Sequence, residues 1–480
     1  MNLKRISTGV AGLDEIMAGG LIAHQAYLVK GQPGSGKTTL GLHFLSAGVV
    51  KGETNLLISF GEPEFKLRRN AQIIGINTDK VVFLDLSPSA DFFTEDRTYD
   101  IFSPGEVEKT PVIHKITEAI DKIKPQRVFL DAITQFRFLT SDNFQFRKQI
   151  QSLLRFMSDR DITLLFTSEG SDRHPDDDLQ FMSDGVIELY NTPTRRGVQI
   201  IKFRGSDFNQ GNHDLKLSDR GIQIYPQLVP KTYQRKFVLE AISSGIPEID
   251  ELLHGGIERG TTTIISGPSG VGKSTFGMQF MKEAAGRGER SVLYAFEEAE
   301  ETLLLRCEAV NIPARTMIDR GTLSVVKIEP LAYSPNQFVQ LVRTEVEQKD
   351  TKIIMLDSTS GYKLSVQGED LVNQLHSLCQ YLKNMGVTVI LINEIPTITG
   401  GQFKVTEAGL SYLADNLIFL RYLELDGHLR KAIGVLKKRV SNFERTLREF
   451  KITKYGIKVG EPLTKLRGIL SGIPKWINKQ

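Results

Sequence analysis

Short apolar runs alternate with amphipathic stretches along the second half of the chain. Residues 261–266 (TTTIIS) form a β-branched run that ends at a glycine-rich loop, and residues 273–288 then show helical apolar spacing with a glycine stop. Further apolar runs, separated by helical patterns such as residues 370–386, span residues 291–296, 323–328, 352–357 and 387–393. Fully apolar strands that alternate with helices predict a parallel sheet with helices on both faces.

The end of this half has a different pattern. Three apolar runs, at residues 416–425, 431–439 and 447–456, follow one another with short gaps and no helical pattern between them. We expect these runs to be antiparallel strands that extend the sheet.

The chain is an internal duplication. The stretch STGVAGLDEIMAGGL at residues 7–21 recurs as SSGIPEIDELLHGGI at residues 243–257. Later motifs also recur in the same order, so both halves are predicted to have one α/β fold. A polar stretch at residues 226–237 contains two prolines and suits a linker. The predicted organisation is a first domain at residues 1–228, a linker at 229–240, a second domain at 241–460 and a C-terminal segment at 461–480.

Composition and charge exclude several classes of protein. Hydrophobic residues make up 40% and charged residues 24% of the 480 residues, which is ordinary for globular domains. Two cysteines cannot form a disulfide framework or a cysteine-rich zinc site. The start of the chain has no apolar leader pattern, and no later apolar run is long enough to span a membrane. We therefore expect a cytoplasmic protein with no membrane partner.

Two glycine-rich loops match G-x-x-x-x-G-K-[ST] in full, at GQPGSGKTT and GPSGVGKST. In such loops backbone N–H groups face the phosphates, the lysine reaches the β and γ oxygens, and the next hydroxyl binds Mg²⁺. Thr38 and Ser274 are the predicted Mg²⁺ ligands. The predicted cofactors are ATP and Mg²⁺, bound by Gly31, Gly34, Ser35, Gly36, Lys37, Thr38 and Thr39 in the first half and by Gly267, Gly270, Val271, Gly272, Lys273, Ser274 and Thr275 in the second.

An aspartate ends a later apolar strand in each half. Asp131 closes VFLD and Asp357 closes IMLD. A carboxylate at this place in a nucleotide-binding fold holds Mg²⁺ through water. The alternative role for each aspartate is to cap a turn.

A pair of acids follows the strand after the second glycine-rich loop. Glu297 and Glu298 lie at the carboxyl end of a predicted parallel strand, where ligands bind in such sheets. A carboxylate there can orient water or accept a hydroxyl proton as the γ-phosphoryl group leaves. The first half has Gly61 in place of the first acid and keeps only Glu62, so we expect slow hydrolysis at its site.

This layout is that of RecA-like ATPases, and its duplicated form resembles the KaiC family of circadian-clock ATPases and autokinases over almost the whole chain. The resemblance implies two tandem RecA-like P-loop domains, each a mostly parallel sheet flanked by helices with antiparallel strands at the end. It also implies a homohexamer with ATP at subunit interfaces, an N-terminal ATPase domain and a C-terminal autokinase domain. A KaiB-like regulatory protein or another signalling partner is implied as well.

The same resemblance suggests where phosphate is accepted. Ser411 lies at the family's serine acceptor, Thr406 matches a threonine five residues earlier, and Tyr412 stands where the family has a second acceptor threonine. The first half has Gln180 and Phe181 at the equivalent places, which fits a domain without an acceptor. The alternative for Ser411 is an ordinary polar residue at the start of a strand.

Basic residues late in each half repeat too. Lys202 with Arg204, and Lys437 with Arg439, put two cations on one side of a strand. The resemblance implies that they contact the γ-phosphate bound to the neighbouring subunit. Charged alternation on an edge strand is also an ordinary solubility feature.

The C-terminal segment is similar only to the start of the family's C-terminal loop. We expect the protein to lack the longer tail that recruits the clock activator in the family. A shorter nucleotide-driven timer or a stress-signalling role is therefore expected as much as a complete clock.

Three hypotheses follow. The first is a hexameric ATPase with an autokinase domain, the second is a nucleotide-gated scaffold that hydrolyses ATP without phosphorylating itself, and the third is a RecA-type DNA motor. The net charge of +3, two full ATPase copies and no separate DNA-binding module make nucleic-acid binding the weakest of the three.

Overall fold

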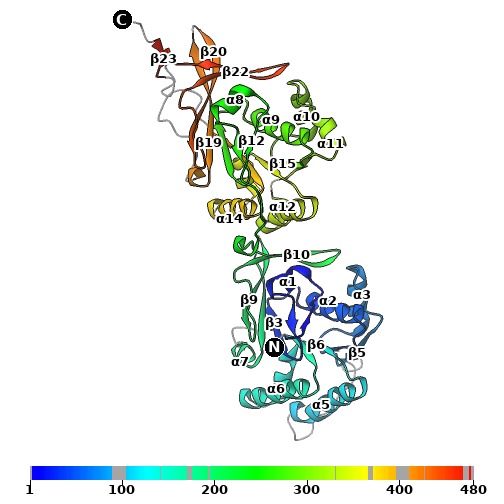
Figure 1. Cartoon of the computed structure of the whole chain (residues 1–480). Coiled ribbons are helices and arrows are strands. Elements are labelled where there is room, and N and C mark those ends of the chain that lie inside the picture. Colours follow the sequence, from blue (N-terminus) through cyan, green and yellow to red (C-terminus); the bar gives the residue numbers. More distant parts are fainter. Residues whose placement is uncertain are drawn as a thin grey trace. The chain divides into compact units, whose positions relative to one another are not determined.

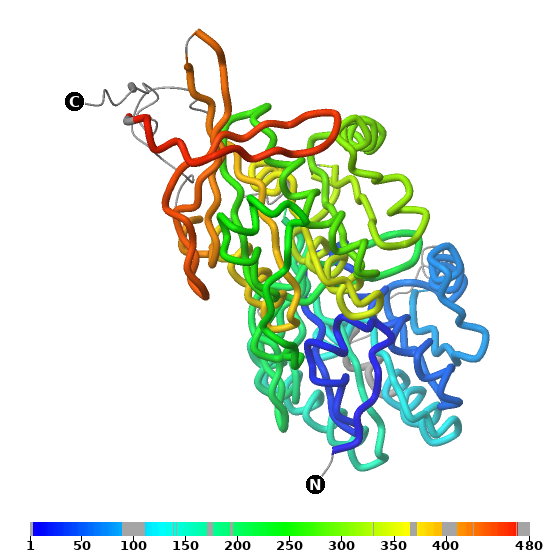
Figure 2. Tube along the Cα trace, turned by 45° about the horizontal axis from the view of Figure 1, so that its top comes forward, coloured from blue at the N-terminus to red at the C-terminus, as the bar shows by residue number. Residues whose placement is uncertain are grey.

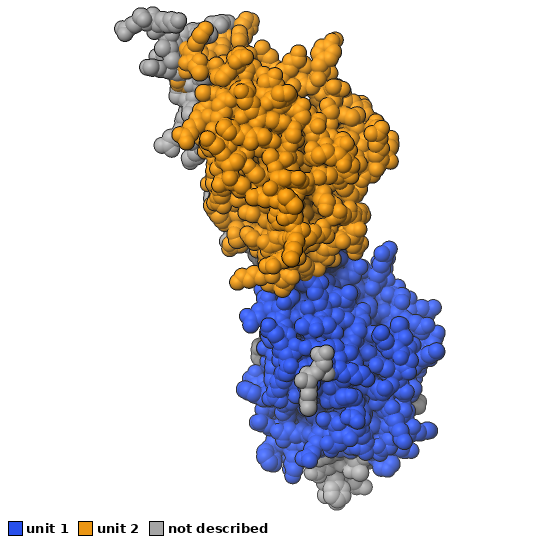
Figure 3. Space-filling view, in the orientation of Figure 1, with its two compact units in different colours: residues 1–227 blue, residues 228–480 orange. Residues whose placement is uncertain are grey.

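The chain forms two compact units, Met1–Gln227 and Leu228–Gln480 (Figure 3). The structure is a computed structural model that describes residues 3–88, 104–140, 142–169, 176–192, 195–329, 331–365, 371–395, 410–425, 427–468 and 475–476. Among the helices of these residues, none has the length and apolar character needed to cross a bilayer.

The N-terminal unit is built on one nine-stranded sheet (Figure 1). In spatial order its strands are β5 (Val81–Asp85), β4 (Asn55–Ser59), β6 (Arg127–Asp131), β7 (Thr163–Thr167), β3 (Ala26–Gly31), β8 (Gly185–Asn191), β9 (Arg196–Phe203), β10 (His213–Ser218) and β11 (Gly221–Tyr225). The first six are parallel and the last three continue the sheet in antiparallel pairing. Its helical elements and short strand pair are α1 (Ala11–Ile16), α2 (Lys37–Val50), α3 (Glu64–Ile73), α5 (Pro104–Ile123), η1 (Ile133–Leu139), α6 (Asn143–Ser158), α7 (Asp177–Met182), β1 (Arg5–Ile6) and β2 (Leu21–Ile22).

The C-terminal unit repeats this topology strand for strand. Its sheet runs β16 (Leu323–Lys327), β15 (Ser291–Ala295), β17 (Ile353–Asp357), β18 (Thr388–Glu394), β14 (Thr262–Gly267), β19 (Asn416–Leu425), β20 (His428–Lys438), β21 (Arg448–Thr453) and β22 (Gly456–Pro462). Its helical elements are η2 (Pro230–Thr232), α8 (Pro247–Leu252), α9 (Lys273–Gly286), α10 (Glu300–Glu308), α11 (Ala314–Asp319), α12 (Pro335–Lys349), α13 (Thr359–Ser365), α14 (Leu371–Asn384) and η3 (Leu410–Tyr412). Two short strand pairs complete it: β12 (Ala241–Ile242) with β13 (Ile257–Glu258), and β23 (Leu466–Arg467) with β24 (Lys475–Trp476).

The predicted fold class is confirmed, and the structure refines its last strands. Strand β19 pairs in parallel with β14 and in antiparallel with β20, so the change of direction comes after β19. Strands β20, β21 and β22 then follow as antiparallel neighbours, in orange and red in Figure 2.

The central strands carry apolar residues on both faces because both faces of each sheet are covered. In β17, Ile353 and Met355 belong to one hydrophobic core, whereas Ile354 and Leu356 belong to the core on the other face. Successive side chains of a strand point to opposite faces. A sheet buried on both sides therefore needs apolar residues without alternation.

Glycines let the helix after each phosphate loop lie close to the sheet. A Cβ atom on Gly277 of α9 would come within 2.4 Å of the Met355 sulfur, and one on Gly41 of α2 would come within 2.1 Å of the Phe129 ring. Gly272, which precedes α9, has φ of 113°, a left-handed conformation that favours glycine. These contacts fix the start of each helix against the strand that ends in the candidate Mg²⁺ aspartate.

The repeated aspartate at the start of each unit has a structural role. Asp14 accepts hydrogen bonds from Ser7 Oγ (2.5 Å), the Thr8 amide (2.8 Å) and Thr8 Oγ1 (2.7 Å). Asp250 makes the same contacts with Ser243 and Ser244. The carboxylate thereby accepts hydrogen bonds from the amide and hydroxyl groups of the turn that precedes α1 or α8. This shared role explains why the motif occurs in both halves.

Residues 228–240 contact the C-terminal unit, to which they belong. Leu228 is part of its hydrophobic core, and the amide of Arg235 donates to the carbonyl of Asn384 in α14 at 2.9 Å. Much of the stretch that we predicted as a linker is therefore packed against this unit.

Candidate active site

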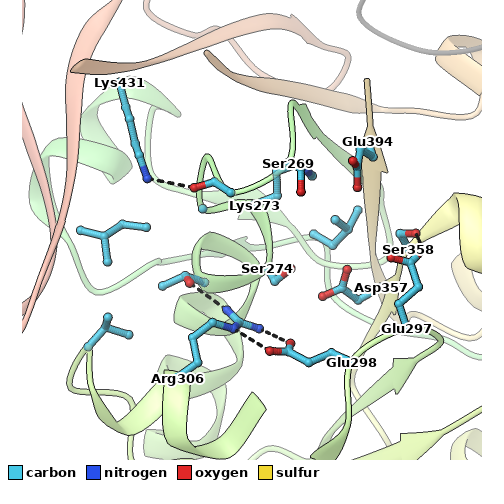
Figure 4. A pocket seen from close by; sticks show the side chains of 16 residues that line it. Ser269, Lys273, Ser274, Glu297, Glu298, Arg306, Asp357, Ser358, Glu394 and Lys431 are labelled. Atoms are coloured by element: carbon cyan, nitrogen blue, oxygen red, sulfur yellow. Dashed lines mark hydrogen bonds and ion pairs between the residues drawn. The ribbon is translucent and has the colours of Figure 1, made fainter. Parts of the chain in front are cut away.

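The glycine-rich loop of the C-terminal unit borders a cavity of about 460 Å³. The cavity is lined by the loop itself, by residues after β15, at the end of β17 and on β18, by α10, and by β20 and β21 (Figure 4). Ligands bind at the carboxyl ends of the strands in open parallel sheets, and this cavity has that position.

The two loop lysines are turned toward their own loops. Lys273 is 7% exposed, and its Nζ donates to the Pro268 carbonyl at 2.8 Å. Burial lowers the pKa of Lys273, while the charges of Glu394, Asp357 and Glu297 oppose that shift. Lys37 donates to the carbonyl of Gly31 at 2.7 Å, and burial likewise lowers its pKa. An ammonium group in this position can neutralise phosphate oxygens at the loop.

The candidate Mg²⁺ residues meet in both units. Thr38 Oγ1 donates to Asp131 Oδ2 at 2.7 Å, and Thr167 donates to the other carboxylate oxygen. In the C-terminal unit, burial raises the pKa of Asp357, and a hydrogen bond from Ser274 counteracts this effect. Hydroxyl and carboxylate oxygens fit Mg²⁺, which takes its remaining ligands from water and nucleotide phosphates.

The two acids after β15 have different partners, as Figure 4 shows. Arg306 of α10 binds Glu298 through two hydrogen bonds of 3.1 and 2.7 Å, and also donates to Thr275 Oγ1 at 3.0 Å. Glu297 instead accepts a hydrogen bond from Ser358 Oγ at 3.0 Å. The charge of Glu298 is therefore compensated by a cation, whereas Glu297 has a neutral partner beside the cavity. Of the two, Glu297 is the better placed to accept a proton.

The N-terminal unit differs at each position around Glu297. Gly61 replaces Glu297 itself, Ala132 replaces Ser358, and Asn70 replaces Arg306 in the duplicated order of the chain. Glu62 is the remaining acid, and its backbone carbonyl accepts a hydrogen bond from Ser59 Oγ at 2.5 Å. The candidate base and two side chains near it are thus changed together in the N-terminal unit.

Two of the predicted acceptors and both cations lie together in the C-terminal unit, and none of these four residues lines its cavity. Ser411 and Tyr412 are exposed in η3, while Thr406 lies outside the described residues. Lys437 Nζ donates to the Ser411 carbonyl at 3.1 Å and Arg439 donates to the Tyr412 carbonyl at 3.2 Å. Neither cation lines the cavity around Lys273.

The N-terminal unit has the same arrangement. Lys202 donates to the carbonyls of Gln180 (2.9 Å), Phe181 (3.1 Å) and Ser183 (2.7 Å), and Arg204 donates to that of Phe181 at 3.4 Å. In both units the repeated cations bind the backbone of the segment that precedes the last parallel strand.

Three charged cavity residues were not predicted from the sequence. Arg306 compensates Glu298, Glu394 ends β18 beside Lys273, and Lys431 of β20 donates to the Gly270 carbonyl at 3.1 Å. Glu394 could have been found, because it too lies at the carboxyl end of a predicted parallel strand. Lys431 reaches the loop from the antiparallel part of the sheet, which no local pattern indicates.

Comparison with known proteins identifies the family. A family model described as "ATPase: KaiC" matches residues 6–229 and 242–464, once for each unit. The chain belongs to the KaiC family of ATPases. It is 28% identical, over 99% of its own length and 95% of the relative's, to the circadian clock protein KaiC3 of Synechocystis sp.. It is 28% identical to the circadian clock oscillator protein KaiC of Parasynechococcus marenigrum, over 99% of this chain and 94% of the relative. It is 27% identical to the protein of the same name from Prochlorococcus marinus, over 100% of this chain and 96% of the relative.

A first prediction for this KaiC-family chain concerns Arg306. Arg306→Leu removes the cation beside Glu298 and one of the charges that lower the pKa of Asp357. The pKa of Asp357 then rises further, so this candidate Mg²⁺ ligand is protonated at higher pH, and we expect ATP turnover to be lost earlier as pH falls. At neutral pH we expect kcat/KM to fall roughly 10-fold, about 1.4 kcal/mol.

The control for this experiment is Arg315→Leu. Arg315 pairs with Glu301 and Glu308 but does not line the cavity. Its removal should leave the pH–rate profile unchanged. An unshifted acid limb in Arg306→Leu would contradict the positioning role.

A second prediction concerns the missing base of the N-terminal unit. A Cβ on Gly61 meets no atom within 4 Å, so Gly61→Glu adds a carboxylate without a clash. In a Lys273→Ala background, which removes the loop lysine of the C-terminal site, we expect ATP turnover to rise roughly 10-fold. This is below the usual range of general-base effects, because the N-terminal unit has no counterparts of Ser358 and Arg306. Phosphate release measures the rate.

Gly286→Glu is the matched control, since a Cβ there also meets no atom within 4 Å. It should leave the rate unchanged. Equal rates for Gly61→Glu and its parent, with nucleotide bound to both, would show that the missing acid does not limit this site.

Proposed function

We propose that the C-terminal half of this KaiC-family ATPase is its main catalytic half, and that it both hydrolyses ATP and phosphorylates its own chain. The observation that carries the proposal is that two adjacent acids have different hydrogen-bond partners. Glu298 is compensated by Arg306, whereas among the described residues the hydrogen-bond partner of Glu297 is the hydroxyl of Ser358, in a cavity that also contains Lys273 and Asp357.

In the proposed reaction Glu297 accepts a proton from the nucleophile. The nucleophile is water in hydrolysis and the hydroxyl of an acceptor residue in autophosphorylation; in each case its oxygen bonds to the γ-phosphorus as the bond to the β–γ bridging oxygen breaks. Lys273 neutralises phosphate charge, while Ser274 and Asp357 hold Mg²⁺, which balances the remaining charge of the phosphates when it is bound. ADP leaves with the bridging oxygen.

The proposed acceptor segment belongs to the neighbouring subunit of a homohexamer. Its candidates are Ser411, Thr406 and Tyr412. Lys437 and Arg439 bind the backbone of Ser411 and Tyr412 and lie outside the cavity of their own subunit, which supports a role at the next subunit's nucleotide. A cation supplied across an interface stabilises the transferring phosphoryl group only after the ring has assembled.

The N-terminal half would bind ATP chiefly for assembly. It lacks the proposed base and two side chains near it, because it has Gly61, Ala132 and Asn70 at these positions. It keeps the nucleotide-binding arrangement through Lys37, Thr38 and Asp131. Lys202 and Arg204 would serve the ring contact there. The relatives are named circadian clock proteins, and we propose a timing or stress-signalling role with a KaiB-like regulatory protein or another signalling partner.

Mass spectrometry after incubation with Mg²⁺ and ATP tests the proposal. Phosphate on the peptide that contains residues 404–415 is expected in the wild type and not in Glu297→Gln, and the fragment spectra identify the acceptor. An unmodified chain that still consumes ATP would overturn the autokinase part and favour a nucleotide-gated scaffold with ATPase activity.

A further inference from the structure

A second cavity, of about 360 Å³, lies in the N-terminal unit between α5 and α6, which Figure 1 labels. Its walls are mostly apolar, with Ile113, Ile116 and Thr117 from α5, Phe136 from η1, and Leu153 and Phe156 from α6. None of the predicted nucleotide-binding residues lines it. We call this cavity the α5–α6 groove.

The internal duplication supplies a counterpart for the groove. Arg127 of β6 pairs with Thr163 of β7, and Ile353 of β17 pairs with Thr388 of β18, at the same places in the two sheets. Helix α5 therefore corresponds to α12 and α6 to α14, since these helices directly precede the paired strands. In this register Thr117 corresponds to Arg343, Phe156 to Tyr381, and Lys124 to Asp350.

In the C-terminal unit the chain's own segment occupies this place. Tyr233 stacks edge-on against Tyr381 with ring centroids 5.1 Å apart, and the Arg343 guanidinium lies 4.8 Å from the Tyr233 ring centre. The backbone at Tyr233 is extended, with φ of −114° and ψ of 120°. The Pro230 carbonyl accepts a hydrogen bond from the Asn384 side chain at 3.0 Å, and the Arg235 amide donates to the Asn384 carbonyl. An extended segment with an aromatic anchor thus covers the groove between α12 and α14.

The apolar walls of the two grooves differ in exposure. Val339 and Leu378 of the C-terminal unit are 6% and 0% exposed. Their counterparts Ile113 and Leu153 are only partly buried. Among the described residues, the same helix pair is therefore more exposed in the N-terminal unit.

We propose that the α5–α6 groove binds an extended segment of a partner protein that carries an aromatic residue and, two positions later, an acidic residue. The aromatic residue takes the place of Tyr233 and packs on Phe156. The acidic preference follows from a charge reversal: Arg235 pairs with Asp350 at 2.7 Å, but Lys124 occupies the corresponding helix end. Both cap residues have left-handed backbones, with φ of 53° for Asp350 and 49° for Lys124, so their side chains leave the helix at the same point.

Thr117 adds to this preference. It replaces Arg343, so this position of α5 supplies no guanidinium to stack on the anchor. Lys148 in the lining and Arg160, which lies 3.6 Å from the centre of the Phe156 ring, are cations that also favour an acidic segment. An aromatic side chain in such a site binds through apolar burial and packing against Phe156. The proposal goes beyond the proposed function and does not depend on catalysis at either nucleotide site.

Fluorescence anisotropy with labelled ten-residue peptides tests the proposal on the full chain. The peptides are residues 228–237 of this chain (LVPKTYQRKF), the same peptide with Arg235→Glu, and the Glu peptide with Tyr233→Ala. We expect the Glu peptide to bind roughly 10-fold or more tightly than its Ala version, because the anchor is lost. It should bind about 3- to 5-fold more tightly than the Arg peptide, as one exposed ion pair allows.

Protein variants locate the binding. Ser152 is exposed and lines the groove, so Ser152→Trp should fill the groove and abolish binding of the Glu peptide. Lys124→Glu should reverse the preference between the Glu and Arg peptides. Lys115→Glu makes the same charge change on an exposed position of α5 outside the groove and should leave the preference unchanged. Unchanged circular dichroism and ATP turnover confirm that the variants are folded.

Three results would overturn the proposal. One is equal binding of the Tyr and Ala peptides, and another is binding that survives Ser152→Trp, which would place the peptide elsewhere. The third is that no peptide binds to the protein at its working concentration. If binding then appears on dilution of the protein, a second copy of the chain covers the groove. Failure of any kind leaves the autokinase measurement unaffected, since that readout is phosphate on residues 404–415.

Discussion

Glu297→Gln is expected to lower ATP turnover by the C-terminal site roughly 10²–10⁴-fold, the range of a general base. The amide keeps the size of the side chain and can still contact Ser358, but it cannot take a proton from water or from an acceptor hydroxyl. Phosphate release in a Lys37→Ala background measures the rate. Because hydrolysis and autophosphorylation both need the proton removed, phosphate on the chain should be lost in parallel.

Glu298→Gln is the matched control, since it changes the adjacent residue in the same way. Its amide leaves Arg306 with a weaker partner, and we expect a loss of only about 10-fold, as for a single charge-assisted hydrogen bond. Equal losses for the two variants would mean that the acids act as one unit. A larger loss for Glu298→Gln would reverse their proposed roles.

The second large effect comes from the two loop lysines. Lys273→Ala should remove most of the chain's ATP turnover, by roughly 10²–10³-fold at its own site, because a buried cation that contacts the transferring phosphate is lost. Lys37→Ala should keep most of the total rate, since the N-terminal site has Gly61 in place of the base. Steady-state phosphate release from each variant makes the comparison.

Lys51→Ala is the control for Lys37→Ala, because Lys51 caps the other end of the same helix and is exposed. It should behave as the wild type. Near-total loss of turnover in Lys37→Ala would contradict a slow N-terminal site, unless the variant no longer assembles, which sedimentation velocity in ATP would reveal.

The sequence predicts the architecture well because apolar strands and glycine-rich loops occur in the same order in both halves. Residues 353–356 are apolar at four consecutive positions, and a sheet buried on both faces accounts for that. The glycine-rich loops place Lys37 and Lys273 without further information. The direction of β19 was not predictable, because a strand at the boundary between parallel and antiparallel pairing has no distinctive side chains.

Much of the candidate site depends on contacts that the sequence does not encode locally. The two acids of AFEEAE look alike in the sequence. They are distinguished by their partners, which are Arg306 of α10 for Glu298 and Ser358, between β17 and α13, for Glu297. Lys431 reaches Gly270 from a strand far along the chain. Residues 228–237 have the composition of a linker, yet Tyr233 finds a partner in Tyr381, which no polarity pattern would indicate.

The glycine contacts under the two loop helices have a consequence for motion. In the N-terminal unit Gly41 rests on the ring of Phe129, whereas in the C-terminal unit Gly277 rests on the thioether of Met355. A phenyl ring resists displacement, while an unbranched methionine can change rotamer to follow a helix that shifts. Helix α9 therefore lies on a more deformable support than α2. The glycine-rich loop before α9, which lies beside the candidate base, consequently has more freedom to adjust when bound ATP is converted to ADP.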